Sequence, residues 1–279
     1  MARRARKARG STESTSAHVA SPHIQRKLPF YDPLDEEQLV KIDAQIDWML
    51  ENIGFAFRDD PEAIRIWETA VGDGVKIEGD RIFADAQWVR AQCAKAPSQF
   101  DQIARNPARS VTIGGNNQVF APIYGAPFAR DLKGGRRYAT YEDFQNLLRL
   151  SYMHPNLHHT GLVIAEPTDI PVSKRHLDMV YSHMVLSDKP HLGAITEKSR
   201  AQDSVDMASL VFGEEFVQNN CVMLNLINAN SPMTFDSTMM GSLEIYAANN
   251  QASIISPFIV GDMAYFGRDH GLVRDSKYL

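Results

Sequence analysis

The chain has 279 residues, 44% of them hydrophobic and 23% charged, which is typical of a globular protein with one large domain or two smaller ones. A formal net charge of −5 gives no general attraction to nucleic acid or to an anionic membrane, and no apolar stretch approaches the roughly 18 to 20 residues of a spanning helix. Cys93 and Cys221 match no paired metal or redox spacing, so we expect a cytoplasmic protein with reduced thiols.

The first part of the chain is predicted to be a basic tail followed by an α+β region. Residues 1–27 hold clustered arginines and then serines and threonines, which favours a disordered tail over a presequence or a nucleic-acid arm. In residues 28–118, Asp35 and Asp85 stand where helix caps are expected, and Pro61 falls in the first turn of another helix. Alternating residues on both sides of short polar turns predict hairpins at 75–83 and 111–121.

The rhythm changes in residues 119–259, where helices alternate with nearly all-apolar runs. The expected helices are 140–153, 172–187, 200–212 and 236–249, and the expected strands are 119–123, 161–165, 191–195, 221–227 and 253–255. Such alternation predicts parallel strands buried on both faces, in sequential neighbour order. Five strands are too few to close a (β/α)₈ barrel. The predicted fold class is therefore α/β, an incomplete TIM-type (β/α) barrel with an N-terminal α+β region.

The end of the chain departs from this pattern. Residues 260–279 carry no further helix and strand, so they are expected to form an atypical C-terminal tail. Either the sheet is an open α/β sheet, or the chain is a fragment of a longer protein.

Three segments in this order and spacing resemble the trimethylamine methyltransferase family of corrinoid-dependent enzymes. They are Gly134 to Thr140, His176 to Pro190, and Asn228 to Pro232 with Phe235 and Asp236. The resemblance covers residues 30 to about 259. It implies a TIM barrel that moves a methyl group from a tertiary or quaternary methylamine, such as trimethylamine or glycine betaine, to the cobalt of a separate corrinoid protein. Family members are considerably longer, so the resemblance also implies C-terminal truncation.

This chemistry asks for a site that holds a cation without N–H donors, which aromatic faces and a nearby carboxylate do well. In a barrel, such a site is built where the strands end. The candidate substrate-binding residues at the expected strand exits are Tyr124, Glu166, Glu197 beside Thr196, Asn228, Asn230 and Phe258. No catalytic residue is assigned.

Each candidate also has a plainer interpretation. Asn228 and Asn230 suit a loop whose backbone needs hydrogen-bond partners before the helix that Asp236 caps. Glu166 precedes a proline and suits a solvated loop, whereas Tyr124 and Phe258 suit packing at the core or rim. These interpretations stay open on sequence alone.

Metal and nucleotide sites find little support. His158 and His159 are adjacent and would point to opposite faces of a strand, and His176 and His183 are too far apart for a helical zinc pair. The glycine pairs lack the spacing of a phosphate-binding loop. We therefore expect no metal and no directly bound cofactor, only a corrinoid protein and a small methylated amine as partners, with a homo-oligomer possible. The zinc-dependent corrinoid methyltransferases and a non-catalytic, amine-binding remnant are the alternatives.

Overall fold

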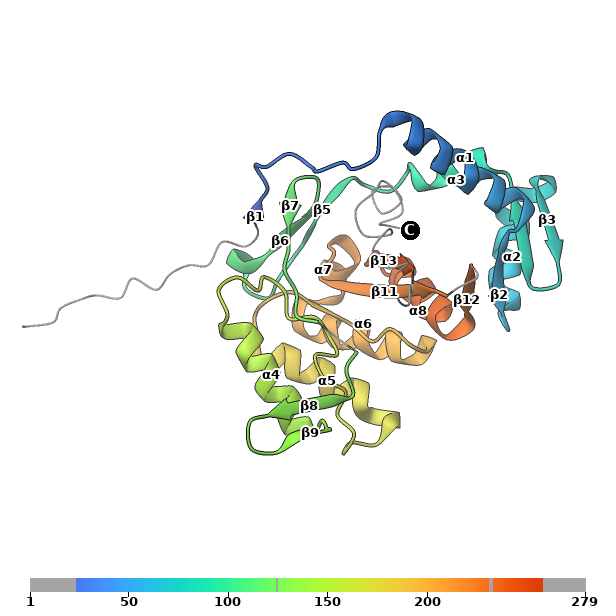
Figure 1. The fold of residues 1–279 in the computed structure, drawn as a ribbon. Coiled ribbons are helices and arrows are strands. Elements are labelled where there is room, and N and C mark those ends of the chain that lie inside the picture. Colours follow the sequence, from blue (N-terminus) through green and yellow to red (C-terminus); the bar gives the residue numbers. More distant parts are fainter. Residues whose placement is uncertain (1–23, 124, 231–232, 258–279) are drawn as a thin grey trace, which may run out of the picture.

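A computed structural model describes residues 24–123, 125–230 and 233–257. The predicted tails therefore lie outside the described residues, except that Ile24–Gln25 forms a short strand, β1 (Figure 1). Within the described ranges no helix is both long and apolar enough to cross a membrane.

The N-terminal region builds a sheet covered by short helices. Its helices are α1 (Glu36–Asn52), α2 (Pro61–Val71), the 3-10 turn η1 (Gly72–Gly74) and α3 (Ala86–Cys93), and its strands are β2 (Phe55–Arg58), β3 (Val75–Glu78) and β4 (Arg81–Ala84). The predicted caps are confirmed, since the carboxylates of Asp35 and Asp85 accept N–H groups of the first turns. The hairpin β3–β4 is confirmed as well.

This sheet has one strand that comes from far along the chain. β12 (Thr234–Asp236) pairs in parallel with β2, and the order is β12-β2-β4-β3. The rings of Phe57 and Phe235 stack with centroids 5.4 Å apart, which joins the core of the N-terminal region to the loop after a barrel strand. The α+β region and the barrel part are thus fastened together beside the ends of the parallel strands.

A second sheet, β1-β7-β6-β5, closes the opposite end of the barrel part. Its other strands are β5 (Gln99–Gln102), β6 (Val111–Gly114) and β7 (Asn117–Gln118), with the 3-10 turn η2 (Pro107–Arg109) between β5 and β6. The buried Gln102 amide donates to the carbonyl oxygens of His191 and Val222, at 2.9 and 3.4 Å. Both acceptors stand at the beginning of parallel strands, so this sheet covers their amino ends.

The barrel part contains a parallel sheet in sequential order. β10 (His191–Leu192), β11 (Met223–Ala229) and β13 (Ala252–Pro257) pair in parallel, which confirms that part of the prediction. The helices α4 (Tyr141–Met153), α5 (Val172–Leu186), α6 (Lys198–Phe212), α7 (Glu214–Asn219) and α8 (Ser237–Ala248) accompany them, and α4, α5, α6 and α8 run in a row along one side (Figure 1). The sheets of the described residues form no closed barrel.

Two of the five predicted strands, 119–123 and 161–165, are not strands in the structure, although they lie next to the segments predicted as their neighbours. Pro122 interrupts the first, and Gly161, at φ = 68°, turns the second out of extended geometry. Backbone bonds still hold the order: His158 N–H to the Phe120 carbonyl at 2.8 Å, and Leu192 N–H to the Gly161 carbonyl at 3.0 Å. The row of parallel segments thus continues beyond β10 as irregular backbone.

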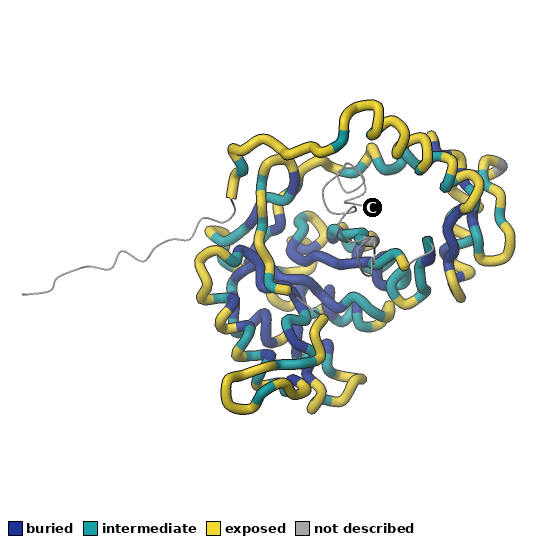
Figure 2. Tube along the Cα trace, viewed as in Figure 1, coloured by how far each residue is buried: buried dark blue, intermediate teal, exposed yellow. Residues whose placement is uncertain are grey.

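The main core lies between this row and the helices, where Figure 2 shows the buried segments gathered. Phe144, Leu148 and Tyr246 are fully buried there. A Cβ on Gly193 would stand 2.0 Å from the Tyr246 hydroxyl oxygen and 2.3 Å from the Met223 sulfur, so only glycine fits there. That hydroxyl donates to the Ala194 carbonyl at 3.0 Å, so α8 packs closely against the segment that follows β10.

A buried ammonium group fixes the end of α4. Lys189 Nζ donates to the carbonyl oxygens of Ser151, His154 and Leu157 at 3.0, 3.0 and 2.7 Å. The usual helical donor to Ser151 would be residue 155, which is a proline and has no N–H. Lys189 replaces that donor and holds the turn that leads into the second parallel segment.

Candidate functional site

The predicted site residues that the structure describes follow the parallel segments at their carboxyl ends. Asn228 lies near the end of β11, Asn230 follows it, and Glu197 follows the segment that β10 begins. Glu166 follows the irregular second segment. Tyr124 and Phe258 lie outside the described residues, so the aromatic part of the site stays a prediction.

The two asparagines differ in their surroundings. On β11, Asn225 faces α8, because its amide nitrogen donates to the Ser242 hydroxyl at 3.1 Å. Side chains alternate along a strand, so the half-buried Asn228 belongs to the opposite face of β11. Asn230 is exposed, and its backbone makes two hydrogen bonds with Thr234, at 2.7 and 2.8 Å. Asn228 is therefore on the face of β11 that turns away from α8, and Asn230 lies just beyond the end of that strand.

Two residues other than glycine have left-handed backbone at this edge. Glu197 has φ = 67° and Met233 has φ = 50°. Such backbone is unfavourable for residues with a Cβ and tends to occur at functional sites. The Glu197 N–H donates to the Thr238 carbonyl at 3.1 Å, and its carboxylate pairs with Arg200 at 2.8 Å. The loop after β10 is thus held against the first turn of α8.

Glu166 is engaged by an arginine. Arg175 Nη1 donates to the Glu166 carboxylate at 2.5 Å, and Arg175 Nη2 donates to the Ile170 carbonyl at 3.1 Å. The Glu166 N–H also donates to the Ala126 carbonyl at 2.8 Å. The plainer interpretation expected a solvated acid, whereas Glu166 is half-buried and holds its loop through Arg175. Its second carboxylate oxygen has no hydrogen-bond partner among the described residues.

A hairpin between the first parallel segment and α4 is absent from the sequence-based prediction. β8 (Phe128–Asp131) and β9 (Gly135–Tyr138) pair antiparallel, with Arg130 opposite Arg136. Asp131 accepts the N–H groups of Lys133 and Gly134, which shapes the turn. A glycine pair between alternating residues was the signal for this turn.

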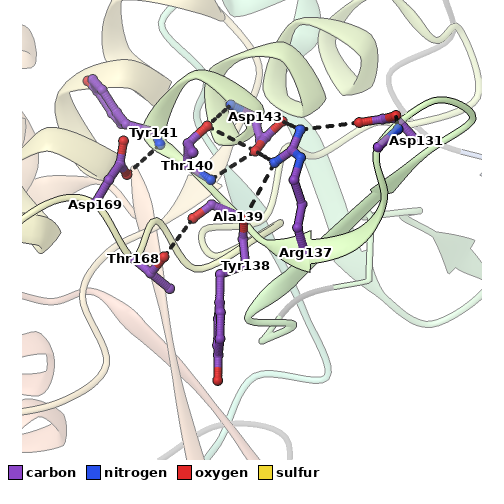
Figure 3. A network of polar contacts seen from close by, with 10 residues as sticks. Asp131, Arg137, Tyr138, Ala139, Thr140, Tyr141, Asp143, Thr168 and Asp169 are labelled. Atoms are coloured by element: carbon purple, nitrogen blue, oxygen red, sulfur yellow. Dashed lines mark hydrogen bonds and ion pairs between the residues drawn. The ribbon is translucent and has the colours of Figure 1, made fainter.

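The hairpin is fastened to the start of α4 by the network in Figure 3. Arg137 pairs with the carboxylates of Asp131 and Asp143. Asp143 also completes the predicted capping box with Thr140, which is confirmed. The hydrogen bond from Arg137 holds the pKa of Asp143 well below its usual range. At the base, the Thr168 N–H donates to the Ala139 carbonyl at 2.9 Å, which ties the hairpin to the loop after the second segment.

Most of the histidines that the structure describes are buried. The rings of His183 and His191 stack with centroids 5.3 Å apart, and His183 contacts the Thr160 hydroxyl and the Leu162 carbonyl, both at 2.9 Å. Burial lowers the pKa of His183 and His191, and lowers that of His159 to about 3. These rings are therefore neutral and hold the strands in place.

The described histidine and acidic side chains do not cluster into a metal site. His176 Nε2 lies 2.7 Å from a carboxylate oxygen of Asp203, which joins α5 to α6 on the helical side. In residues 24–123, 125–230 and 233–257, no group of three or more histidine, cysteine, aspartate or glutamate side chains is arranged to hold a metal ion. The absence of a resident metal stays a prediction.

The chain also has a family relationship, which agrees with its row of parallel segments and neighbouring helices. The model of the family "Trimethylamine methyltransferase (MTTB)" matches residues 2–264, and the chain belongs to this family. Among curated proteins, the chain is similar to the glycine betaine methyltransferase of Desulfitobacterium hafniense (strain Y51). The two are 39% identical over 234 residues, which are 84% of this chain and 48% of that relative. The chain thus spans about half the length of the relative that it matches.

Proposed function

We propose that this chain takes part in the transfer of a methyl group from a quaternary or tertiary methylamine, of the glycine betaine or trimethylamine type, to the cobalt of a corrinoid protein. The carrying observation is membership of the trimethylamine methyltransferase family, together with 39% identity to a glycine betaine methyltransferase. The polar carboxyl edge of the parallel segments supports a site there.

The proposed reaction requires positioning more than acid or base catalysis. The bond between the methyl carbon and nitrogen breaks, and the nitrogen keeps the electron pair and leaves as a neutral amine. The reduced cobalt of the acceptor supplies the electron pair of the new bond to carbon. No proton has to move when the substrate is a quaternary ammonium or a tertiary amine bound in its protonated form, so the protein contributes orientation and exclusion of water.

The described residues suggest a division of tasks within this proposal. Asn228, on the face of β11 that turns away from α8, would orient the substrate with its amide group, and Asn230 would act from just beyond the end of that strand. The free carboxylate oxygen of Glu166 would face the cation, while Arg175 fixes the loop. Tyr124 and Phe258 remain the predicted aromatic contacts. Each contributes from about 0.5 kcal/mol with an exposed cation to about 2 kcal/mol with a buried one.

The test uses glycine betaine and trimethylamine with free cob(I)alamin as acceptor, and follows the demethylated amines by mass spectrometry. We expect Asn228→Ala to lower the rate at least tenfold, which corresponds to about 1.4 kcal/mol. Asn146→Ala is the matched control, because this exposed asparagine lies on α4 away from the carboxyl edge. Equal rates for both variants would contradict the proposed site.

The same assay separates the alternatives. Binding of the amine, measured by calorimetry, without any demethylated product would favour the non-catalytic, amine-binding alternative. Loss of activity with a chelator and its return with zinc would favour the zinc-dependent class.

A further inference from the structure

The hairpin β8–β9 has two chemically different faces. Side chains alternate along a strand, so Asp131 and Arg137 share the face that turns toward α4, where Arg137 reaches Asp143. The other face carries Phe128 and Tyr138, whose rings lie 4.8 Å apart, and the cross-strand pair Arg130 and Arg136. Figure 3 shows Tyr138 pointing away from the network that fastens the hairpin.

This second face is basic and exposed. It carries Arg130 and Arg136, and Lys133 lies in the turn at its tip, in a chain whose formal net charge is −5. Arg130, Lys133 and Arg136 are exposed, and Tyr138 is 62% exposed. Within the described ranges neither Arg130 nor Lys133 takes part in an ion pair. Leu132 is fully exposed at the tip.

The arrangement is costly for the hairpin itself. Two like charges directly opposite each other on antiparallel strands destabilise the pairing. Arg136 is held in place all the same, with its guanidinium carbon 3.6 Å from the centre of the Phe128 ring. Arginine and aromatic side chains on a rigid support are the residues that dominate protein interfaces. The face therefore suits an external anionic partner better than it suits the fold.

The position of the hairpin points to the methyl acceptor as the partner. Its base is hydrogen-bonded to residues 163–168, through Gly125 to the Val163 carbonyl and Thr168 to the Ala139 carbonyl, at 2.8 and 2.9 Å. The hairpin therefore stands at the carboxyl edge of the parallel segments, beside the site where the methyl acceptor must approach. We propose that the face of Phe128, Arg130, Lys133, Arg136 and Tyr138 is the docking surface for an acidic patch on the corrinoid protein. This inference rests on the proposed function, because that function requires a protein acceptor.

The experiment measures association by surface plasmon resonance. The probe is the corrinoid-binding protein encoded nearest to the gene of this chain, loaded with its corrinoid. For Arg130→Glu/Lys133→Glu we expect the association rate constant to fall at least tenfold at about 50 mM salt, and the difference from wild type to shrink at about 500 mM. The association rate constant of the neutral variant Arg130→Gln/Lys133→Gln should lie between those of wild type and of the glutamate variant. The fold of each variant is checked by circular dichroism.

A control changes the net charge equally at another place. Lys41→Glu/Lys95→Glu alters two exposed lysines of the N-terminal region and should stay within twofold of wild type. The docking surface would be overturned if the control variant associated with the probe as slowly as the hairpin variant. It would also be overturned if the hairpin variant associated as fast as wild type, or if the wild-type chain did not bind the probe. Equally tight, hairpin-dependent binding of a 20-base-pair DNA duplex would overturn it in favour of a general polyanion surface.

Transfer to free cob(I)alamin separates this inference from the proposed function. The hairpin variant should keep that rate within twofold, because the small acceptor needs no docking surface. If wild type fails to demethylate any amine but binds the probe through the hairpin, the proposed chemistry is wrong and the docking surface stands. If transfer to free cob(I)alamin proceeds and the hairpin has no effect on binding, the docking surface is wrong and the chemistry stands.

Discussion

Replacing Lys189 by methionine should destabilise the protein strongly, although this residue lies outside the proposed site. Methionine keeps the length and much of the volume of the side chain but has no donors. Three carbonyl oxygens, of Ser151, His154 and Leu157, would each lose an N–H donor that now lies within 3.0 Å. Lys189 is 5% exposed, so water has little access to replace those bonds.

The magnitude follows from the number of acceptors. A buried polar group left without its partner costs about 1 to 3 kcal/mol. Three acceptors therefore set a range of about 3 to 9 kcal/mol, and removing the cost of burying the ammonium offsets part of it. We expect a net loss of about 4 kcal/mol, a large share of the 5 to 15 kcal/mol that stabilises a typical domain. Burial lowers the pKa of Lys189 to about 8, so at pH 7 the ammonium form is still present.

The assay is urea unfolding at pH 7 followed by circular dichroism, with hydrogen exchange of residues 150–158 as the local measurement. Lys174→Met is the matched control, because Lys174 is exposed and makes a single ion pair with Asp178 on α5. It should change the free energy of unfolding by less than about 1 kcal/mol. If Lys189→Met behaves like this control, and exchange at the end of α4 does not accelerate, the capping role of Lys189 is wrong.

Three further predictions concern the core. The folded pKa of His159 is about 3, below its ordinary value of 6.5, so the unfolded chain binds more protons between these values and stability is lost as the pH falls from 6.5 toward 3. At pH 4.5 the loss is about 3 kcal/mol. His159→Asn should therefore make the free energy of unfolding depend less steeply on pH in acid unfolding. Gly193→Ala should cost about 1 to 3 kcal/mol, and less when Tyr246→Phe removes the hydroxyl that its Cβ would meet; additive costs in a double-mutant cycle would contradict this contact. Phe235→Ala should cost about 2 kcal/mol and accelerate hydrogen exchange in β12, and unchanged exchange there would refute the stacking on Phe57 as an anchor.

The sequence predicted those features that depend on neighbouring residues. Asp35, Asp85 and Thr140 cap their helices as expected, since a cap needs only a side-chain oxygen a few residues from the N–H groups that it accepts. The parallel order of β10, β11 and β13 also followed from the local alternation of helices and apolar runs. The carboxyl-edge positions of Glu197, Asn228 and Asn230 came with that order.

Tertiary structure decided what depends on residues far apart in the chain. The pairing of β12 with β2, the engagement of Glu166 by Arg175 and the donation of Lys189 to the end of α4 leave no periodic signal in the sequence. The hairpin β8–β9 combines both cases, because its glycine turn is local but its orientation depends on the pairing of Arg137 with Asp143. Helix caps and the alternation of helices and strands depend on bonds between residues a few positions apart. Which partner a charged side chain pairs with is decided only when distant parts of the chain pack together.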